Sequence, residues 1–401
     1  MTMWSGQTHY DVVKEVAKFQ HDFHLIKYGK QPWDLAWWDA PIPINIISKM
    51  HTWQRCNHLP GIYNLAKKNM LGRHLMRMQK EFPEDYDFFP QTFMLPHDYK
   101  DFMQVIGEKR NKTFIVKPEA LSQGKGIFLT RSPDQLLVNQ SGQKEDVVMD
   151  HMIVQRYLTK PYLLDGYKFD FRLYVLINGI SPMRIYMYND GLARLATELY
   201  KMPAPGNLNN LFMHLTNYAI NKESAKYQQN DSETRDDVGH KRSYAAVMRL
   251  LRAKHGDEAV DTLSAEINDI IIKTMCIAQP HVHHLIRSAQ PDDLQNETCF
   301  QILGFDVILD DNLRPYLLEV NQMPSFATDS PLDSKIKSGV IFDTIAMLNL
   351  SRRRRYKQML ERKKEQERRL MQKFNPGAVD KKQVIREAHM FVQKEKAGDP
   401  F

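Results

Sequence analysis

The clearest hydrophobic pattern in the chain is a pair of apolar runs between residues 300 and 326, with the sequence FQILGFDVILDDNLRPYLLEVNQMPSF. The polar tip Asp310-Asp311-Asn312 separates the two runs, which is typical of a β-hairpin. With the turn centred on this tip, Asp306 lies opposite Glu319 on the returning strand. Side chains alternate between the two faces of a strand, so Glu319 and Asn321 point the same way. The pattern therefore predicts that these three oxygen-bearing side chains cluster inside an apolar hairpin.

A bound cation is the interpretation that we favour for this cluster. Two buried carboxylates repel each other and lose their hydration unless a positive charge lies between them. Ligand sets made only of oxygen favour magnesium over zinc. The alternative is a hairpin whose acidic side chains simply face water. Burial of the cluster is favoured by its apolar neighbours, which are Phe305, Val307, Ile308, Leu317, Leu318 and Val320. We therefore favour a magnesium site at Asp306, Glu319 and Asn321.

Further hydrophobic patterns predict the elements around this hairpin. Residues 62–82 form an amphipathic pattern with one basic side, which indicates a surface helix. The preferred interpretation is that the basic side is solvated; the alternative is that it faces a substrate. The other elements expected are a weak helix in residues 1–30, a strand at 42–48, helices at 244–255 and 258–277, and a closing helix at 335–350 that carries Lys337.

A glycine-bearing hairpin at residues 111–131 is a candidate phosphate site. Strands predicted at 113–116 and 127–130 flank the loop Gln123-Gly124-Lys125-Gly126, and Lys117 follows the first strand. Glycines let backbone N–H groups approach phosphate oxygens, and lysines supply positive charge. The segment matches neither a Walker A nor a G-x-G-x-x-G motif. Taken alone, such a hairpin is structural more often than nucleotide-binding.

Residues 153–158 and the strand after them favour nucleotide binding. The segment Gln155-Arg156-Tyr157-Leu158 is similar to a strand that turns into a hinge, where free backbone groups could contact the edge of an adenine. In the next strand, YKFDFRLYVLI, Lys168, Asp170 and Arg172 share one face, and the other face is apolar. Lys168 and Arg172 suit a polyphosphate, and Asp170 could orient either of them or a ribose.

Three further polar segments follow along the chain. Arg194 comes just after a turn predicted at Asn189-Asp190-Gly191. Residues 213–222, MHLTNYAINK, predict a polar strand or loop. Residues 223–242 are polar and rich in turn-forming residues, so we expect a mobile loop with Lys241 at its end.

Length and composition restrict the class of protein. With 401 residues, the chain is long enough for two or three domains. It has no run of eighteen apolar residues, and its N-terminus lacks the basic-then-apolar pattern of a secretory signal, so neither a membrane span nor secretion is expected. The three scattered cysteines, Cys56, Cys276 and Cys299, argue against a disulfide framework or a zinc knuckle and fit a reducing compartment.

Positive charge is concentrated in one segment. The formal net charge is +7, but residues 352–373, RRRRYKQMLERKKEQERRLMQK, alone contain eleven Lys or Arg against three Glu. The rest of the chain is therefore close to neutral. The segment predicts a basic helix that either binds an acidic polymer or is simply solvated, with its glutamates paired to basic neighbours. Nucleic acid is disfavoured as the polymer, because Tyr356 is the only aromatic residue of the segment for base stacking.

Six motifs together resemble the tubulin tyrosine ligase-like family, whose fold is of the ATP-grasp type. They occur in the family's order and spacing across residues 33–350, and the glutamylase branch is the most similar. The motifs are Lys117-Pro118, Gln123-Gly124-Lys125-Gly126-Ile127, Lys168-Phe169-Asp170-Phe171-Arg172, Met213-His214-Leu215-Thr216-Asn217-Tyr218, Gly304-Phe305-Asp306 and Leu318-Glu319-Val320-Asn321.

This resemblance implies a mixed α/β (α+β) fold of the ATP-grasp type, with antiparallel sheets, flanking helices and a basic helix after the core. The expected domains are an N-terminal extension at 1–32, an N-terminal domain at 33–110, a central ATP-grasp domain at 111–180, a C-terminal ATP-grasp domain with the metal site at 181–350, and a basic microtubule-binding helical tail at 351–401.

The resemblance also implies an activity. In this family ATP phosphorylates a carboxylate, and an amino group then attacks the acyl phosphate to give an amide bond. The glutamylases join free L-glutamate to glutamate side chains in tubulin tails. The implied cofactors are ATP and Mg²⁺, and the implied partners are tubulin or microtubules and free L-glutamate, with neither nucleic acid nor membrane. The implied location is the cytoplasm, at the microtubule cytoskeleton, with cilium or basal body included.

Acyl phosphates hydrolyse readily, so the loop at 223–242 is expected to act as a lid that excludes water.

The family's other roles carry over to matching residues. Magnesium would be held by Asp306, Glu319 and Asn321, and the catalytic set would be Arg172, Glu319 and Lys168, with Arg172 steadying the transferred phosphoryl group. The substrate-binding set would be Arg194, Tyr218, Ala219, Lys241, Lys337 and Gln322. ATP would be held by Lys117, Gln123, Lys125, Gly126, Gln155, Arg156, Tyr157, Leu158, Lys168, Phe169, Asp170, Thr216 and Asn217.

The chain departs from the family pattern at three positions. Ala219 stands where Ser is common, Glu119 where Asp is usual, and Gln322 where His, Ile or Arg occurs. Gln322 and Arg156 are expected to face the acceptor chain, so branch initiation and branch elongation both stay open. A ligase for another amino acid, such as glycine, or for a non-tubulin acidic protein is the alternative activity. A catalytically silent microtubule-binding relative is a third interpretation, against which the intact metal-binding set speaks.

Overall fold

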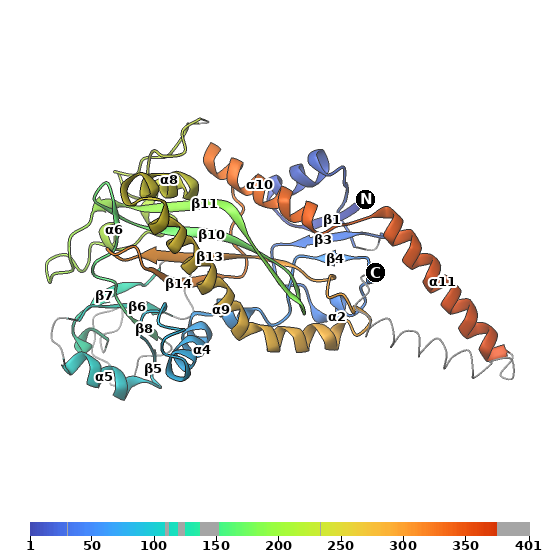
Figure 1. The fold of residues 1–401 in the computed structure, drawn as a ribbon, viewed down its shortest axis with the longest axis horizontal. Helices are drawn as coiled ribbons and strands as arrows, with labels where there is room; N and C mark the ends of the chain where they lie inside the picture. Colours follow the sequence, from blue (N-terminus) through green and yellow to red (C-terminus); the bar gives the residue numbers. More distant parts are fainter. Residues whose placement is uncertain (30, 109–111, 119–124, 137–151, 233, 375–401) are drawn as a thin grey trace. The chain divides into compact units, whose positions relative to one another are not determined.

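The computed structural model describes residues 1–29, 31–108, 112–118, 125–136, 152–232 and 234–374 (Figure 1). The chain separates into two compact units, Met1–Asn349 and Leu350–Phe401. The first unit contains three sheets and several helices, which confirms the expected mixed α/β fold with antiparallel sheets. The described residues of the second unit form the helix α11 (Arg352–Phe374), as the basic segment predicted. Within the described residues, no helix is both long and apolar enough to cross a membrane.

The largest sheet supports the candidate site, and all of its strand pairs are antiparallel. In spatial order its strands are β12 (Lys241–Ser243), β11 (Met183–Leu199), β10 (Tyr167–Ile180), β13 (Gln301–Leu309) and β14 (Pro315–Asn321), and β9 (Leu163–Leu164) also pairs with β10. Alternate residues of β10, such as Phe171 and Leu173, are fully buried in one core with helix α9 (Asp257–Ala289). Figure 1 shows α9 crossing this face of the sheet. The other face of β10 is therefore free to carry polar residues.

The predicted hairpin is confirmed in β13 and β14. Asp306 pairs with Glu319, and Gly304 pairs with Asn321, so the expected register is correct. Between the two strands the register shifts beside Asp306, which leaves Leu318 as the extra residue of a bulge. Leu318 is half-buried, and the other five apolar neighbours are buried. Alternation of side chains along buried strands was therefore sufficient to predict this pairing.

The turn expected at residues 189–191 is wrong, because β11 runs through this segment as a bulged strand. The register of β10 and β11 shifts beside Gly191. A Cβ atom on Gly191 would lie 2.7 Å from the carbonyl oxygen of Arg172, so the close approach of the two backbones requires glycine. The Asp190 carboxylate accepts hydrogen bonds from the N–H groups of Gly191 and Ala245, at 2.8 and 3.0 Å. These bonds satisfy a polar side chain within a strand, where the sequence suggested a turn.

A smaller antiparallel sheet carries the glycine-bearing hairpin. In spatial order its strands are β5 (Thr92–Leu95), β8 (Met152–Arg156), β6 (Phe114–Pro118) and β7 (Phe128–Thr130). The strands expected at 113–116 and 127–130 are confirmed as β6 and β7, which pair with each other. Helix α5 (Tyr99–Glu108) contributes Phe102 to the core of this sheet, against Phe93 and Phe114, and a short 3₁₀ helix follows at Pro133–Leu136.

The third sheet is parallel and lies at the N-terminal end of the chain. In spatial order its strands are β2 (His24–Ile26), β1 (Thr2–Gln7), β3 (Leu35–Trp38) and β4 (Arg55–Cys56). The weak helix expected in residues 1–30 is confirmed as α1 (Asp11–Glu15) with a π-helical turn at Val16–Gln20. The strand expected at 42–48 is wrong, because these residues form α2 (Ile44–Ile47). The carbonyl oxygen of Pro43 accepts the N–H groups of Ile46 and Ile47, which closes a helical turn that buries Ile47 and leaves Ile44 half exposed.

Most of the expected helices are present, with changes at their ends. The helix expected at 62–82 is divided into α3 (Tyr63–Ala66) and α4 (Lys68–Glu81), because Lys67 is extended. Helix α8 (Tyr244–His255) is confirmed. Helix α9 continues past the expected end at 277 and through Pro280, since Val282 and Ile286 still bury their side chains in the core. Helix α10 (Pro331–Met347) begins four residues before the expected start at 335, because Ser330 caps it.

The polar strand or loop expected at 213–222 is instead largely helical. Two short helices, α6 (Leu211–His214) and α7 (Tyr218–Asn221), flank an irregular segment. The side chain of Asn221 fixes this arrangement: its Nδ2 donates to the carbonyl oxygen of Leu215, and its Oδ1 accepts from the backbone N–H and the hydroxyl of Thr197.

Paired strands cross each of the expected domain boundaries at 32/33, 110/111 and 180/181. The division into domains remains a prediction.

Candidate active site

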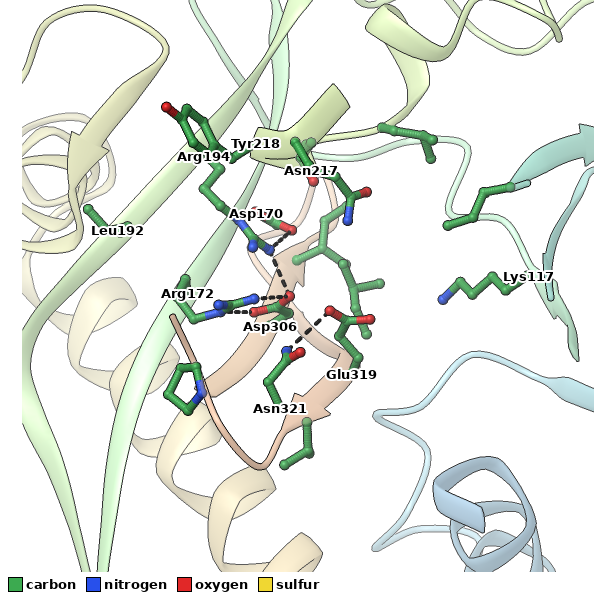
Figure 2. A pocket seen from close by; sticks show the side chains of 18 of the residues that line it. Lys117, Asp170, Arg172, Leu192, Arg194, Asn217, Tyr218, Asp306, Glu319 and Asn321 are labelled. Carbon is green, nitrogen blue, oxygen red and sulfur yellow. Dashed lines mark hydrogen bonds and ion pairs between the residues drawn. The ribbon is translucent and has the colours of Figure 1, made fainter. Parts of the chain in front are cut away.

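A cleft of about 1100 Å³ is lined by both antiparallel sheets. The larger sheet contributes β10 to β14, the smaller sheet contributes β6 and β8, and helices α3, α4, α6, α7 and α10 contribute further lining residues. Figure 2 shows Lys117 of the smaller sheet reaching toward the side chains of the larger sheet. The predicted residues that line the cleft are Lys117, Gln155, Arg156, Tyr157, Leu158, Lys168, Asp170, Arg172, Arg194, Thr216, Asn217, Tyr218, Ala219, Lys241, Asp306, Glu319, Asn321 and Lys337.

Within the described part of the chain, four predicted residues do not line the cleft. Phe169 is 1% exposed, and its side chain packs in the core on the apolar face of β10, so only its backbone is near the site. Lys125 and Gly126 are exposed in the loop before β7 and lie outside the cleft lining. Gln322 lines a separate, smaller cavity beside Trp37 and Trp38, because it follows Asn321 and points to the other side. Gln123, like Glu119, lies outside the described residues.

Two lysines face the cleft from the two sheets: Lys168 is buried, and Lys117 is half-buried. Lys168 Nζ donates to the hydroxyl of Tyr157 at 2.9 Å and to the carbonyl oxygen of His214 at 2.8 Å. Lys117 Nζ donates to Oε1 of Gln155 at 2.8 Å. Burial lowers the pKa of Lys168 to about 7 and the pKa of Lys117 to about 8. Both amines therefore take up protons readily when an anion approaches, which suits a polyphosphate.

Arginine–carboxylate pairs connect β10, β11 and β13 (Figure 2). Arg172 donates to both oxygens of Asp306, from Nε at 2.5 Å and from Nη2 at 2.9 Å. Arg194 donates to both oxygens of Asp170, at 2.8 and 2.6 Å, and its Nη2 also reaches Asp306 at 2.8 Å. The two guanidinium groups hold the pKa of Asp306 well below its usual range, although burial opposes this. Asp306 is therefore ionised in the absence of any ligand.

The second carboxylate of the hairpin has a different environment. Glu319 accepts a hydrogen bond from Nδ2 of Asn321 at 3.1 Å, which leaves the amide oxygen of Asn321 as its available ligand atom. Burial and the negative charge of Asp306 raise the pKa of Glu319. A cation between the two carboxylates would remove this penalty, so the three residues fit a magnesium ion. The described residues contain no cluster of three or more Asp, Glu, His or Cys side chains that could hold a metal by themselves. Water and phosphate oxygens would therefore complete the coordination.

A third group of side chains brings together Lys241 and Lys337. Asp333 lies between them, 2.6 Å from Nζ of Lys241 and 2.8 Å from Nζ of Lys337. Nζ of Lys241 also lies 4.0 Å from the ring centre of Tyr218. Asp333 was not among the predicted site residues. The one sequence pattern that involves Asp333 is the Ser330 three positions before it. This pattern predicts a helix cap, and it does not predict a binding site.

The description of the loop at 223–242 leaves out residue 233, and the described part is held at several points. Nε2 of Gln229 donates to the carbonyl oxygen of Asp329 at 2.9 Å, next to the start of α10. Nδ1 of His240 accepts the N–H of Gln228 at 2.9 Å. Lys241 follows as the first residue of β12, as expected. The mobility and lid function of the loop remain predictions.

Two antiparallel sheets that contribute lysines to one cleft, with a carboxylate pair on a hairpin of the larger sheet, define a fold of the ATP-grasp-like class. Comparison with known families gives a narrower assignment. The chain belongs to the tubulin-tyrosine ligase family, whose model matches residues 46–366.

Several curated relatives are similar over most of this chain. A probable beta-tubulin polyglutamylase of Tetrahymena thermophila is 48% identical over 347 residues, which are 86% of this chain and 28% of the relative. The tubulin polyglutamylase TTLL7 of Xenopus tropicalis is 37% identical over 384 residues, 93% of this chain and 40% of the relative. The human tubulin polyglutamylase TTLL6 is 41% identical over 318 residues, 79% of this chain and 34% of the relative. The chain therefore spans well under half the length of these relatives.

Proposed function

We propose that this chain is an ATP- and Mg²⁺-dependent ligase that adds L-glutamate to glutamate side chains of tubulin C-terminal tails. The observation that carries the proposal is the convergence of three sites in one cleft: two lysines for phosphate, a carboxylate pair for a cation, and a lysine pair for an anion. The similarity to proteins named tubulin polyglutamylases supports the choice of donor and acceptor.

ATP would lie between the two sheets. Lys117 and Lys168 would bind its phosphates from opposite sides, and each is held by a hydrogen bond to a neighbouring side chain, Gln155 or Tyr157. The hinge after β8, where Tyr157 and Leu158 line the cleft, would face the adenine. Asp306, Glu319 and Asn321 would hold Mg²⁺, which when bound neutralises charge on the phosphates.

Positioning and charge are sufficient for the chemistry that we propose. Phosphoryl transfer from ATP to the acceptor carboxylate requires alignment and neutralisation of charge more than a nucleophilic side chain. Arg172, fixed by two hydrogen bonds to Asp306, would steady the transferred phosphoryl group. The amino group of glutamate would then attack the acyl phosphate, forming the amide bond and releasing phosphate.

ADP release tests this function directly. With MgATP and tubulin, the purified chain should release ADP at a rate that depends on added L-glutamate. Equal stimulation by glycine would overturn the donor assignment and leave the ligase chemistry in place. Release with an acidic protein but not with tubulin would overturn the acceptor. Absence of turnover, with tubulin binding intact, would favour the catalytically silent alternative.

The basic helix α11 is proposed to bind microtubules, whose tails are acidic, which would locate the protein at the microtubule cytoskeleton. We expect that replacing the four arginines at 352–355 with glutamate weakens co-sedimentation with microtubules by about tenfold or more, because it converts attraction into repulsion. Binding of the unmodified chain should also weaken as salt rises, because exposed charges are screened. Four lysines at the same positions keep the charge and serve as the matched control. An unchanged affinity and salt profile in the glutamate variant would contradict this role.

A further inference from the structure

The buried carboxylate of Asp333 organises two lysines of the cleft that come from different elements. Lys241 belongs to β12, and Lys337 lies one helical turn after Asp333 on α10. Asp333 is 0% exposed, and it lines the cleft together with the two lysines, which are 5% and 6% exposed. Oδ2 of Asp333 accepts hydrogen bonds from Nζ of Lys241 at 2.6 Å and from the hydroxyl of Ser330 at 3.1 Å, and Oδ1 forms the ion pair with Lys337.

The contact with Asp333 favours the charged form of Lys337. Burial alone would favour neutral forms, and it lowers the pKa of Lys337. The charge of Asp333 opposes this effect on Lys337, and the two lysines lower the pKa of Asp333. With both amines protonated and the carboxylate ionised, the formal charge of the cluster is +1.

The two ammonium groups retain donors for a ligand. Among the described residues, Nζ of Lys241 donates one hydrogen bond, to Asp333, and its other close neighbour is the ring of Tyr218. Nζ of Lys337 donates to the carbonyl oxygen of Ala327 and lies beside Asp333. An ammonium group has three N–H donors. Both lysines can therefore donate to one further anion in the cleft.

Arg194 is less available than this pair. Three of its hydrogen bonds go to Asp170 and Asp306, so its charge is compensated by two carboxylates. A carboxylate that enters the cleft consequently finds more uncompensated positive charge at Lys241 and Lys337 than at Arg194.

We propose that Asp333 is a positioning residue, which holds Lys241 and Lys337 as the binding site for one carboxylate of the amino-acid donor. The inference rests on the proposed ligase function and extends it to a residue that does not itself touch the donor. Because no part of the Asp333 side chain is exposed and both of its oxygens already have partners, the ligand adds to the cluster and does not replace the carboxylate.

The test is the isosteric variant Asp333→Asn, with Asp343→Asn as the matched control on the exposed side of the same helix. Binding of free L-glutamate is measured by calorimetry in the presence of a non-hydrolysable ATP analogue and Mg²⁺, and KM for glutamate and for ATP is measured by ADP release. We expect Asp333→Asn to weaken glutamate binding about 30-fold or more, with KM for ATP changed less than twofold. The control should leave both quantities unchanged.

The pH dependence separates positioning from a general effect on the fold. The charged and titratable groups around the two lysines are Asp333, the exposed Asp329, Tyr218, Tyr227, Tyr174 and Arg194, which pairs with Lys241 between β11 and β12. Without the charge of Asp333, burial lowers the pKa of Lys337 further. As the pH rises, glutamate binding by the variant should therefore begin to weaken at a lower pH than binding by the unmodified chain. A purely structural loss would reduce the active fraction equally at every pH.

The outcomes are distinct. If the unmodified chain binds no amino acid, the proposed function itself is wrong. If the unmodified chain binds glutamate and Asp333→Asn binds it equally or more tightly, Asp333 is a competitor or a bystander, and this inference is overturned. If Asp333→Asn does not fold, Ser330→Ala is used instead. It removes the hydrogen bond to the Asp333 carboxylate and the cap bond from the N–H of Asp333, and it keeps every charge. It should weaken glutamate binding about threefold with KM for ATP unchanged, and unchanged glutamate binding would count against the proposal.

Discussion

Replacing Glu319 by glutamine should reduce ligase activity about 10³-fold or more, while the chain stays folded. The variant keeps the shape and the hydrogen bond to Asn321 but removes one of the two carboxylates that face each other across the hairpin. A magnesium ion bound by Asp306 alone, which is already compensated by two arginines, would be held weakly. Loss of a catalytic metal costs several kcal/mol of transition-state stabilisation, which corresponds to this change in rate.

Stability measurements without activity check the same assignment. The pKa of Glu319 is raised in the folded chain, so its contribution to stability is present at low pH and is lost as pH rises through the raised pKa. At pH 7 to 8 without metal, Glu319→Gln should therefore be at least as stable as the unmodified chain. Added Mg²⁺ should raise the unfolding temperature of the unmodified chain, and that of the variant much less. Asp311→Asn, at the exposed tip of the same hairpin, is the matched control. Full activity in Glu319→Gln would show that the metal assignment is wrong.

The second large effect is expected at Lys168. We predict that Lys168→Met lowers kcat/KM for ATP about 10²-fold or more, because it removes a buried positive charge that faces the phosphates. The unmodified chain should also take up protons when it binds ATP near pH 8. The pKa of Lys168 is about 7 and that of Lys117 is about 8 before binding, and phosphate favours the charged form of both.

Calorimetry in buffers of different ionisation enthalpy measures this proton uptake. Lys168→Met should take up fewer protons than the unmodified chain. The control variant Lys160→Met, at an exposed position, should take up as many protons as the unmodified chain. Folding is not expected to fail. A buried lysine with a lowered pKa destabilises the folded chain below the usual pKa of lysine, and that cost disappears in the variant. Normal ATP affinity and unchanged proton uptake in Lys168→Met would place the phosphates elsewhere.

Parts of the fold that depend on one repeating period could be predicted from the sequence. The hairpin register, with Asp306 opposite Glu319, follows from alternation in buried strands around an unambiguous polar tip. The same alternation placed Lys168, Asp170 and Arg172 on one face of β10, and all three line the cleft.

Tertiary contacts decided what the sequence could not. Asn189-Asp190-Gly191 has the composition of a turn, but the neighbouring strand approaches so closely that glycine is needed within a strand. Phe169 is a different case: its role was carried over from a family motif, although alternation along the strand already placed its side chain on the apolar face, where the core buries it. Asp333 has the local signature of a helix cap, and only the folding of β12 against α10 brings Lys241 to it.

The most direct test of the central claim is mass spectrometry of tubulin after incubation with the chain, ATP, Mg²⁺ and an equimolar mixture of free amino acids. The account predicts a series of tail-peptide masses that differ by one glutamate residue, with tandem spectra that locate the additions on glutamate side chains. These spectra also distinguish branches that are begun from branches that are lengthened. Additions of another residue mass, or tubulin that stays unmodified while the chain binds it, would contradict the account.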